Sequence, residues 1–278
     1  MRLPFDAHNH VHLGPVPPLV ALKSALSGCS LLSGMALMST QPRDFRRVSQ
    51  LTESLSRQVP GVRIVPCYGV HPWFLHELTD RDWEALSGVP KWVQELDDWI
   101  VASSDAMVGE IGLDAARFDP ETGDLPTSMD RQMIAFEAQM EIAARRERPV
   151  VVHSVQCWGL MMSVLSRLKK SSNLPPRIYF HAFGGKVGTV NQLLALCGRD
   201  TTYFGFAPVI NFRSPKTADV IRRIGLDRIV LETDHEDASL VEESIKCGIK
   251  YIAEALGEPE EIVIERTTAN ALVLYQLS

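Results

Sequence analysis

Short apolar runs recur along the whole chain, and longer stretches of mixed polar and apolar residues separate them. The runs are rich in β-branched and aromatic residues, as expected of strands that are covered on both faces of a parallel sheet. The pattern predicts eight strands, at residues 3–8, 31–39, 63–70, 106–111, 149–154, 177–181, 201–206 and 228–233.

The intervening stretches have the periodicity of amphipathic helices, most clearly at residues 130–147. One stripe of this helix is apolar and the opposite face is charged. The apolar stripe holds Met133, Phe136, Met140 and Ala143, and the charged face holds Arg131, Glu137, Glu141 and Arg145. Strands that alternate with helices favour a closed (β/α)8 TIM barrel, with a doubly wound open sheet as the alternative.

The least regular stretch is 115–129, directly after the predicted strand that carries Glu110. Long loops beside a site often act as substrate lids, and a plain surface insertion explains the stretch equally well.

Length and composition limit the organisation of the chain. Its 278 residues suit one large α/β barrel or two smaller domains, and we expect one barrel domain over 1–278. A hydrophobic content of 45% is sufficient for a sizeable core. The net charge of -6 argues against a broad basic nucleic-acid surface. It does not exclude a nuclease, because bound divalent cations can supply positive charge.

The cysteines indicate a reducing compartment. There are five, scattered and without a C-x-x-C motif, so no disulfide framework is expected. We see no signal-peptide pattern and no apolar run long enough to span a membrane. We therefore expect a cytoplasmic or nuclear protein that binds no membrane, and nothing in the sequence indicates an obligate protein partner.

Imidazole and carboxylate groups recur where the predicted strands end, which is where a parallel barrel gathers its chemistry. In a strand, residues i and i+2 point to the same side, so His8 and His10 can bind one ion, while His12 lies one step further out. An acid at the last strand, Asp234, can ligate a metal and accept a proton from attacking water. Such a mixture of ligands is typical of hydrolases that hold two metal ions.

Each group alone has a plain structural explanation. The H-x-H segment can be a solvated loop, Glu110 can cap a helix, and His153 and His181 can be core histidines with one satisfied nitrogen. Five such groups at five different strand ends favour a shared site.

Seven short motifs follow one another along the chain. They are Asp6-Ala-His8-Asn-His10, Gly69-Val-His71-Pro, Gly109-Glu110-Ile-Gly-Leu-Asp114, Pro149 to His153, Phe180-His181-Ala-Phe-Gly, Glu232-Thr-Asp234, and Asn270 with Leu274. In this order, the motifs resemble those of the TatD-related metal-dependent hydrolases, within the amidohydrolase-like TIM-barrel superfamily. The resemblance covers nearly the whole chain and includes Arg131-Gln132 and Phe136.

The resemblance implies two divalent ions, Mg²⁺, Mn²⁺ or Zn²⁺, that share a water. It assigns metal ligands in two sets that share Glu110: His8, His10, Glu110 and Asp234 in one, and Glu110, His153 and His181 in the other. It further implies that Asp234 and Glu110 act in catalysis, with Glu232 as a second acidic partner. His71 would contact the scissile phosphate. Family members commonly act as DNases, so the implied activity is 3′–5′ exonuclease-like cleavage of DNA, single-stranded or at 3′ ends.

The chain departs from the family pattern around the implied substrate. Many members carry an Arg two residues after the fifth-strand histidine, where this chain has Val155, and Gly184 stands where Ser is common. After E-T-D, a small residue, a proline and an apolar residue are usual, but here the sequence is His235-Glu236-Asp237. Two extra acids would repel a polyanion, and His235 could be an additional ligand. The metal residues are therefore retained while the substrate face is altered.

Two other functions remain open. The same metal residues could serve a small-molecule hydrolase acting on an amide, a lactone or a small phosphoester, or the barrel could be a binding or scaffold protein without turnover. A basic groove would favour the nuclease, and its candidate residues are Arg117, Lys186, Arg213 and Lys216.

Overall fold

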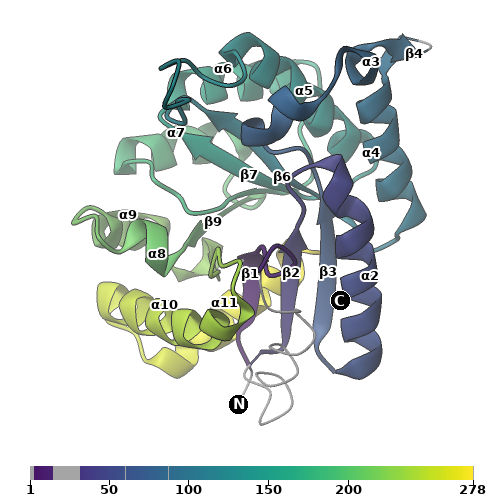
Figure 1. Ribbon diagram of the computed structural model, residues 1–278. Helices are drawn as coiled ribbons and strands as arrows, with labels where there is room; N and C mark the ends of the chain where they lie inside the picture. The colour runs from purple at the N-terminus through teal and green to yellow at the C-terminus, as the bar shows by residue number, and fades with distance from the viewer. Residues whose placement is uncertain (1–2, 15–31, 60, 87, 278) are drawn as a thin grey trace.

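The computed structural model describes residues 3–14, 32–59, 61–86 and 88–277. Eight parallel strands form one sheet in the order β1-β2-β3-β6-β7-β8-β9-β10 (Figure 1). The sheet curves into a nearly closed (β/α)8 barrel, as predicted. Its strands are β1 (Phe5–Asn9), β2 (Gly34–Met38), β3 (Arg63–Tyr68), β6 (Met107–Asp114), β7 (Val150–Val155), β8 (Ile178–Phe180), β9 (Thr202–Phe206) and β10 (Ile229–Leu231).

Helices alternate with these strands and cover the outside of the barrel (Figure 1). The longer ones are α2 (Pro42–Gln58), α4 (Lys91–Ala102), α5 (Met129–Arg145), α6 (Trp158–Lys170), α7 (Val187–Cys197), α9 (Thr217–Ile224), α10 (Val241–Leu256) and α11 (Glu260–Leu274). Short elements in the loops are η1 (Pro72–Glu77), α3 (Asp80–Trp83), β4 (Ala85–Leu86), β5 (Val89–Pro90), α8 (Pro208–Asn211), η2 (Leu226–Arg228) and η3 (Ala238–Leu240). None of the described helices has the length and apolar character needed to span a membrane.

The apolar core has two layers because every strand is buried on both faces. The larger layer lies between the strands and the helices, and a smaller cluster fills the barrel. Tyr275, which follows α11, joins the inner cluster, and its hydroxyl donates to the Ala7 carbonyl at 2.5 Å. Asn270 of α11 donates to the carbonyls of Leu226 and Ile229, both at 2.8 Å. Asn270 therefore anchors α11 to the start of β10, away from the ends that carry the metal residues.

Backbone and side-chain hydrogen bonds join the last strand to the first. The amide of Asp234 donates to the carbonyl of His8 at 2.9 Å, and the amide of His10 donates to that of His235 at 2.9 Å. The buried carboxylate of Asp6 accepts from the Thr233 amide at 3.1 Å and from its hydroxyl at 2.8 Å. These contacts bring the two histidines of β1 beside Asp234, although more than two hundred residues separate them.

Differences from the predicted elements are small and local. The strand predicted at 106–111 continues to Asp114, because its last residues pair with β7, so Glu110 lies within the strand and not at its end. The helix predicted at 130–147 stops at Arg145, before Glu147 with its φ of 52° and before Pro149. Position 31 of the second predicted strand lies outside the described residues, as does Cys29, and the four described cysteines are free thiols.

Candidate active site

The predicted metal residues meet at the C-terminal end of the barrel. They line or adjoin a cavity of about 300 Å³ whose walls include His10, Glu110, His153, His181 and Asp234. Each comes from a different strand or the residues just after it, because parallel strands direct their C-terminal ends to the same rim.

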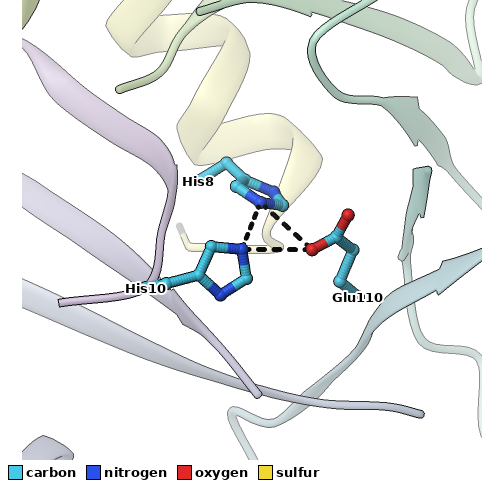
Figure 2. A group of neighbouring side chains, drawn as sticks. All are labelled: His8, His10 and Glu110. Carbon is cyan, nitrogen blue, oxygen red and sulfur yellow. Dashed lines mark hydrogen bonds and ion pairs between the residues drawn. The ribbon is translucent and has the colours of Figure 1, made fainter. Parts of the chain in front are cut away.

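Glu110 lies at the centre of this group. Its Oε2 atom is 3.1 Å from His10 Nε2 and 3.5 Å from His8 Nε2. Figure 2 shows these three side chains pointing toward one another. Its Oε1 atom faces the other way, 2.6 Å from His181 Nε2 and 3.1 Å from His153 Nδ1. The two oxygens of one carboxylate thus face two separate histidine pairs.

Asp234 belongs to the side of His8 and His10. Its Oδ1 atom is 3.4 Å from His8 Nε2 and 3.6 Å from His10 Nε2. Its backbone has a φ of 57°, a conformation that aspartate adopts more readily than most residues. Among the described residues, three groups of side chains each have potential ligand atoms within 4.8 Å of one another. They are His8–His10–Glu110, His8–His181–Asp234 and His71–Glu110–His153.

Hydrogen bonds outside the cluster set the tautomers of two histidines. His10 Nδ1 lies 3.0 Å from the Met38 carbonyl, which only accepts, so Nδ1 carries the proton and the Nε2 lone pair faces the cluster. When the His153 ring is neutral, as metal binding requires, its Nε2 donates to Asp114 at 2.9 Å and its Nδ1 lone pair faces Glu110. Lone pairs and carboxylate oxygens that converge in this way fit divalent cations, because both are metal ligands.

His71 has the opposite arrangement. The Trp73 amide donates to its Nδ1 atom at 3.1 Å, and burial lowers the pKa of His71 to about 4, so the neutral ring carries its proton on Nε2. That Nε2–H lies 3.3 Å from Glu110 Oε1. His71 is close enough to count among the potential ligands, but its tautomer makes it a hydrogen-bond donor into the cavity. Such a donor suits a substrate oxygen better than a cation.

The electrostatics of the site favour positive charge at its centre. Burial alone would raise the pKa of Glu110, yet the surrounding histidines, His181 first, hold it well below its usual value. Burial also opposes the shift at Asp234, where His8 lowers the pKa to about 2. Conversely, Asp114 and Glu110 raise the pKa of His153 to about 9 against the effect of burial. Both site carboxylates are therefore ionised at neutral pH and available to bind cations.

Sequence reasoning gave no role to the residues that hold these side chains in place, although Asp114 and Gln132 belong to the motifs that carry the family resemblance. Asp114 accepts from His153 and also from the indole N–H of Trp73 at 2.7 Å. Gln132 of α5 accepts from the Asp114 amide at 2.8 Å. Two turns further along the same face of α5, Gln139 accepts from the amide of Val70 at 2.7 Å. Val70 directly precedes His71. A glutamine on the apolar face of a helix, seven residues from another, was the signal that could have identified them.

Glu232 and His12 lie outside the cluster. The Glu232 carboxylate accepts from the Tyr179 hydroxyl and, at 2.7 Å, from the Ala182 amide, and burial raises its pKa to about 8. It therefore fixes the turn that carries His181, and none of the potential ligand groups among the described residues includes it. His12 is buried with its Nε2 atom 3.8 Å from Asp44, on the outer side of His10.

Of the positions that depart from the family pattern, Val155 and Glu236 line the cavity. Gly184 lines an adjoining hollow. His235 lines a different hollow, together with Arg213, and the Asp237 carboxylate caps η3 by accepting from Ser239 at 2.9 Å. Of the three residues after Asp234, only Glu236 thus faces the cavity.

The four basic residues that were candidates for a nucleic-acid groove lie in three separate places. The Arg117 guanidinium lies over the Trp73 ring at 4.1 Å from its centroid, at one side of the cavity. Lys186 and Lys216 share a second hollow, and Arg213 lies in a third.

Comparison with known proteins agrees with this geometry. A model of the family described as TatD related DNase matches residues 5–276. A zebrafish (Danio rerio) protein named putative deoxyribonuclease tatdn3 is 30% identical, with 84% of this chain and 82% of that protein covered. A fission yeast protein named Cut9-interacting protein scn1 is 24% identical over 97% of this chain and 98% of its own length. The solved structure of the TatD homologue YjjV from Escherichia coli superposes with a TM-score of 0.77 at 22% identity, covering 99% and 98% of the two chains, which supports the barrel fold.

Proposed function

This chain belongs to the TatD-related DNase family of metal-dependent hydrolases, and we propose that it is a deoxyribonuclease that removes nucleotides from the 3′ ends of single-stranded DNA. The observation that carries the proposal is the position of Glu110 between two histidine pairs, one facing each carboxylate oxygen. A carboxylate so placed can bridge two cations.

We assign the residues as follows. His8, His10, Glu110 and Asp234 would hold one divalent ion, and Glu110, His153 and His181 would hold the other. When bound, Mg²⁺, Mn²⁺ or Zn²⁺ would make water a better nucleophile and stabilise the phosphoryl charge. Asp234, whose side chain is 18% exposed, faces the cavity and would accept a proton from the attacking water. The Nε2–H of His71 would donate to a phosphoryl oxygen as its negative charge grows.

Two further observations support a nucleic-acid end as substrate. Trp73 and Phe74 line the cavity, and aromatic faces stack on bases without regard to sequence. The cavity is also small, about 300 Å³, which suits the end of a single strand better than a duplex. The name of the zebrafish relative, a putative deoxyribonuclease, agrees with this substrate. In this assignment Glu232 positions His181 and takes no direct part in the reaction.

A small phosphoester, amide or lactone is the second candidate substrate. Glu236 favours it, because a carboxylate on the cavity wall repels a polyanion more strongly than a small neutral or singly charged molecule.

One experiment separates the two candidates. Purified protein is incubated with Mg²⁺, Mn²⁺ or Zn²⁺, with and without chelator, on a single-stranded DNA labelled at its 5′ end and on the same strand with its 3′ end blocked. A small phosphodiester, an amide and a lactone are tested in parallel. We expect metal-dependent shortening of the free strand only. Hydrolysis of a small substrate with no loss of DNA would replace the nuclease assignment by the second candidate.

We propose a cytoplasmic or nuclear location for one barrel domain over 1–278 that acts without an obligate protein partner. Microscopy of the tagged protein tests the location. Gel filtration of the purified protein, with activity measured in each fraction, tests whether it is active without a partner.

A further inference from the structure

We propose that the hollow lined by Lys186 and Lys216 binds a second phosphate of the substrate, beside the one that is cleaved. The inference rests on the proposed function and adds to it a requirement for a second phosphate, which a nucleic-acid strand has and a small ester with one phosphate lacks.

The hollow adjoins the metal cavity. It has a volume of about 280 Å³, and Ile210 lines both spaces. One wall is the turn after β8, where Gly184, Gly185 and Lys186 follow His181 within five residues. The opposite wall comes from the segment between α8 and α9, which carries Lys216. A strand whose terminal phosphodiester lies at the metal residues can therefore extend directly into the hollow.

The charge of the hollow fits an anion. None of the residues that line it is acidic, and neither lysine forms an ion pair with any residue among those described. Other lysines differ: Lys91 pairs with Asp82 at 3.9 Å, and Lys246 pairs with Glu242 at 2.7 Å. On a protein of net charge -6, two unpaired cations that share one hollow create a local positive potential next to the cavity.

A hydrogen-bonded side chain fixes the spacing of the two walls. The side-chain amide of Asn211 donates to the backbone carbonyls of Ala182 and Phe183, both at 3.2 Å. The Thr217 hydroxyl donates to the backbone carbonyl of Asn211 at 2.8 Å. These bonds connect the turn that carries Lys186 to the segment that carries Lys216. Since Ala182 follows His181, the hollow has a defined position relative to the metal residues.

The surface of the hollow also leaves room for a phosphate group. A side-chain carbon added at Gly184 would meet nothing within 4 Å, so the backbone there is open to an approaching ligand. Lysine ammonium groups bind phosphate as point charges. Glu236, which lines the metal cavity and not the hollow, would repel the strand, so the two features together favour the path toward the lysines.

The test compares two double variants that remove the same charge. Lys186→Ala with Lys216→Ala removes both positive charges from the hollow. Lys170→Ala with Lys250→Ala removes two exposed lysines that line none of the cavities described. Binding of a fluorescent single-stranded DNA ten-mer is measured by anisotropy over a range of NaCl concentrations. Hydrolysis of the ten-mer and of bis(p-nitrophenyl) phosphate, which has a single phosphate, is measured in parallel with Mn²⁺.

We expect the first variant to bind the ten-mer about tenfold more weakly at low salt, since each lysine contributes an unscreened contact. Its log–log salt dependence should become shallower by about 0.7, the value for the loss of one phosphate contact on a single strand. Hydrolysis of the one-phosphate ester and all properties of the control variant should be unchanged. Equal binding and an equal salt slope for wild type and the first variant would overturn the inference. A wild type that binds the ten-mer through these lysines but hydrolyses no phosphodiester would overturn only the proposed function.

Discussion

The buried cluster of candidate metal residues and the rim of the cavity differ in how far they retain the residues of the family. The cluster consists of His8, His10, Glu110, His153 and His181, all buried and placed in strands or directly after them. The rim lies in the loops that carry Gly184 and Glu236 and at the end of β7, at Val155. The cluster retains the residues to which the family resemblance assigns metal binding, whereas the rim departs from the family pattern.

This difference indicates that the chemistry and the choice of substrate are carried by separate parts of the molecule. A buried ligand cannot be changed without leaving its partners uncompensated, because buried charges depend on one another. An exposed loop residue can change while the cluster stays intact. Substitutions in the cluster should therefore affect all substrates equally, and substitutions at the rim should affect long polyanions selectively.

The largest effect is expected for Glu110→Gln. Both histidine pairs lose the charge of their common carboxylate, so metal binding and hydrolysis of every substrate should fall. The loss of several kcal/mol of charge stabilisation corresponds to about 10³-fold or more in rate. Glu236→Gln is the matched control, since it removes an acid from the wall of the same cavity. Turnover within tenfold of wild type would show that Glu110 does not hold the metal.

Asp234→Asn should have the next largest effect. It preserves the shape of the side chain but removes the charge and the proton acceptor, so hydrolysis of single-stranded DNA should fall by roughly 10² or more. The fold should survive, because Asp234 lies at the open end of the barrel. Circular dichroism checks the fold, and single-turnover rates check the chemistry. Equal rates for variant and wild type would show that the proposed mechanism is wrong.

Asp114→Asn tests whether the cluster depends on the hydrogen bonds that surround it. An amide N–H directed at the Nε2–H of His153 would disfavour the tautomer that faces Glu110. Loss of such a supporting carboxylate should weaken metal affinity by about 10–100-fold. Calorimetric titration with Zn²⁺ or Mn²⁺ measures the affinity. Asp119→Asn, in the loop that follows β6 and more exposed than Asp114, is the control and should bind as wild type does. Unaltered affinity in Asp114→Asn would exclude this role.

The smallest effect is expected at the rim. Repulsion of about 1 kcal/mol between Glu236 and a phosphate about 4 Å away corresponds to roughly fivefold in rate. Glu236→Gln should therefore speed cleavage of DNA at low salt and have little effect at high salt. Asp237→Asn keeps the cap of η3 and should change nothing alone, although the sequence suggested that both acids act together. Acceleration by Asp237→Asn, or a gain that is independent of salt, would contradict the assignment.

The strands and the ligand types could be predicted because both have local signals. A buried parallel strand is a continuous apolar run, and its end is marked by a polar residue such as His153. The partners of Gln132 and Gln139 could not be predicted in this way. The two glutamines stand out on the apolar face of α5, but their bonds reach backbone amides 18 and 69 residues away, at the ends of β6 and β3. No local pattern identifies partners at such distances.

The direction of individual side chains was also beyond sequence reasoning. His71 carries its proton on Nε2 because of a backbone amide two residues away, and His235 turns toward a separate hollow because of the loop that follows β10. Glu232, which the family resemblance associates with the acids of the site, contacts Tyr179 and Ala182. Loop conformation and through-space contacts decide these cases, and neither follows from spacing along the chain.

Metal content tests the central claim most directly. Wild type, His181→Ala and Glu110→Ala are saturated with Mn²⁺ or Zn²⁺ at neutral pH, passed through a desalting column and analysed for metal per chain. The arrangement of Glu110 between two histidine pairs predicts two ions for wild type, about one for His181→Ala and close to none for Glu110→Ala. Wild type without bound divalent metal, or Glu110→Ala with the same content as wild type, would contradict the account.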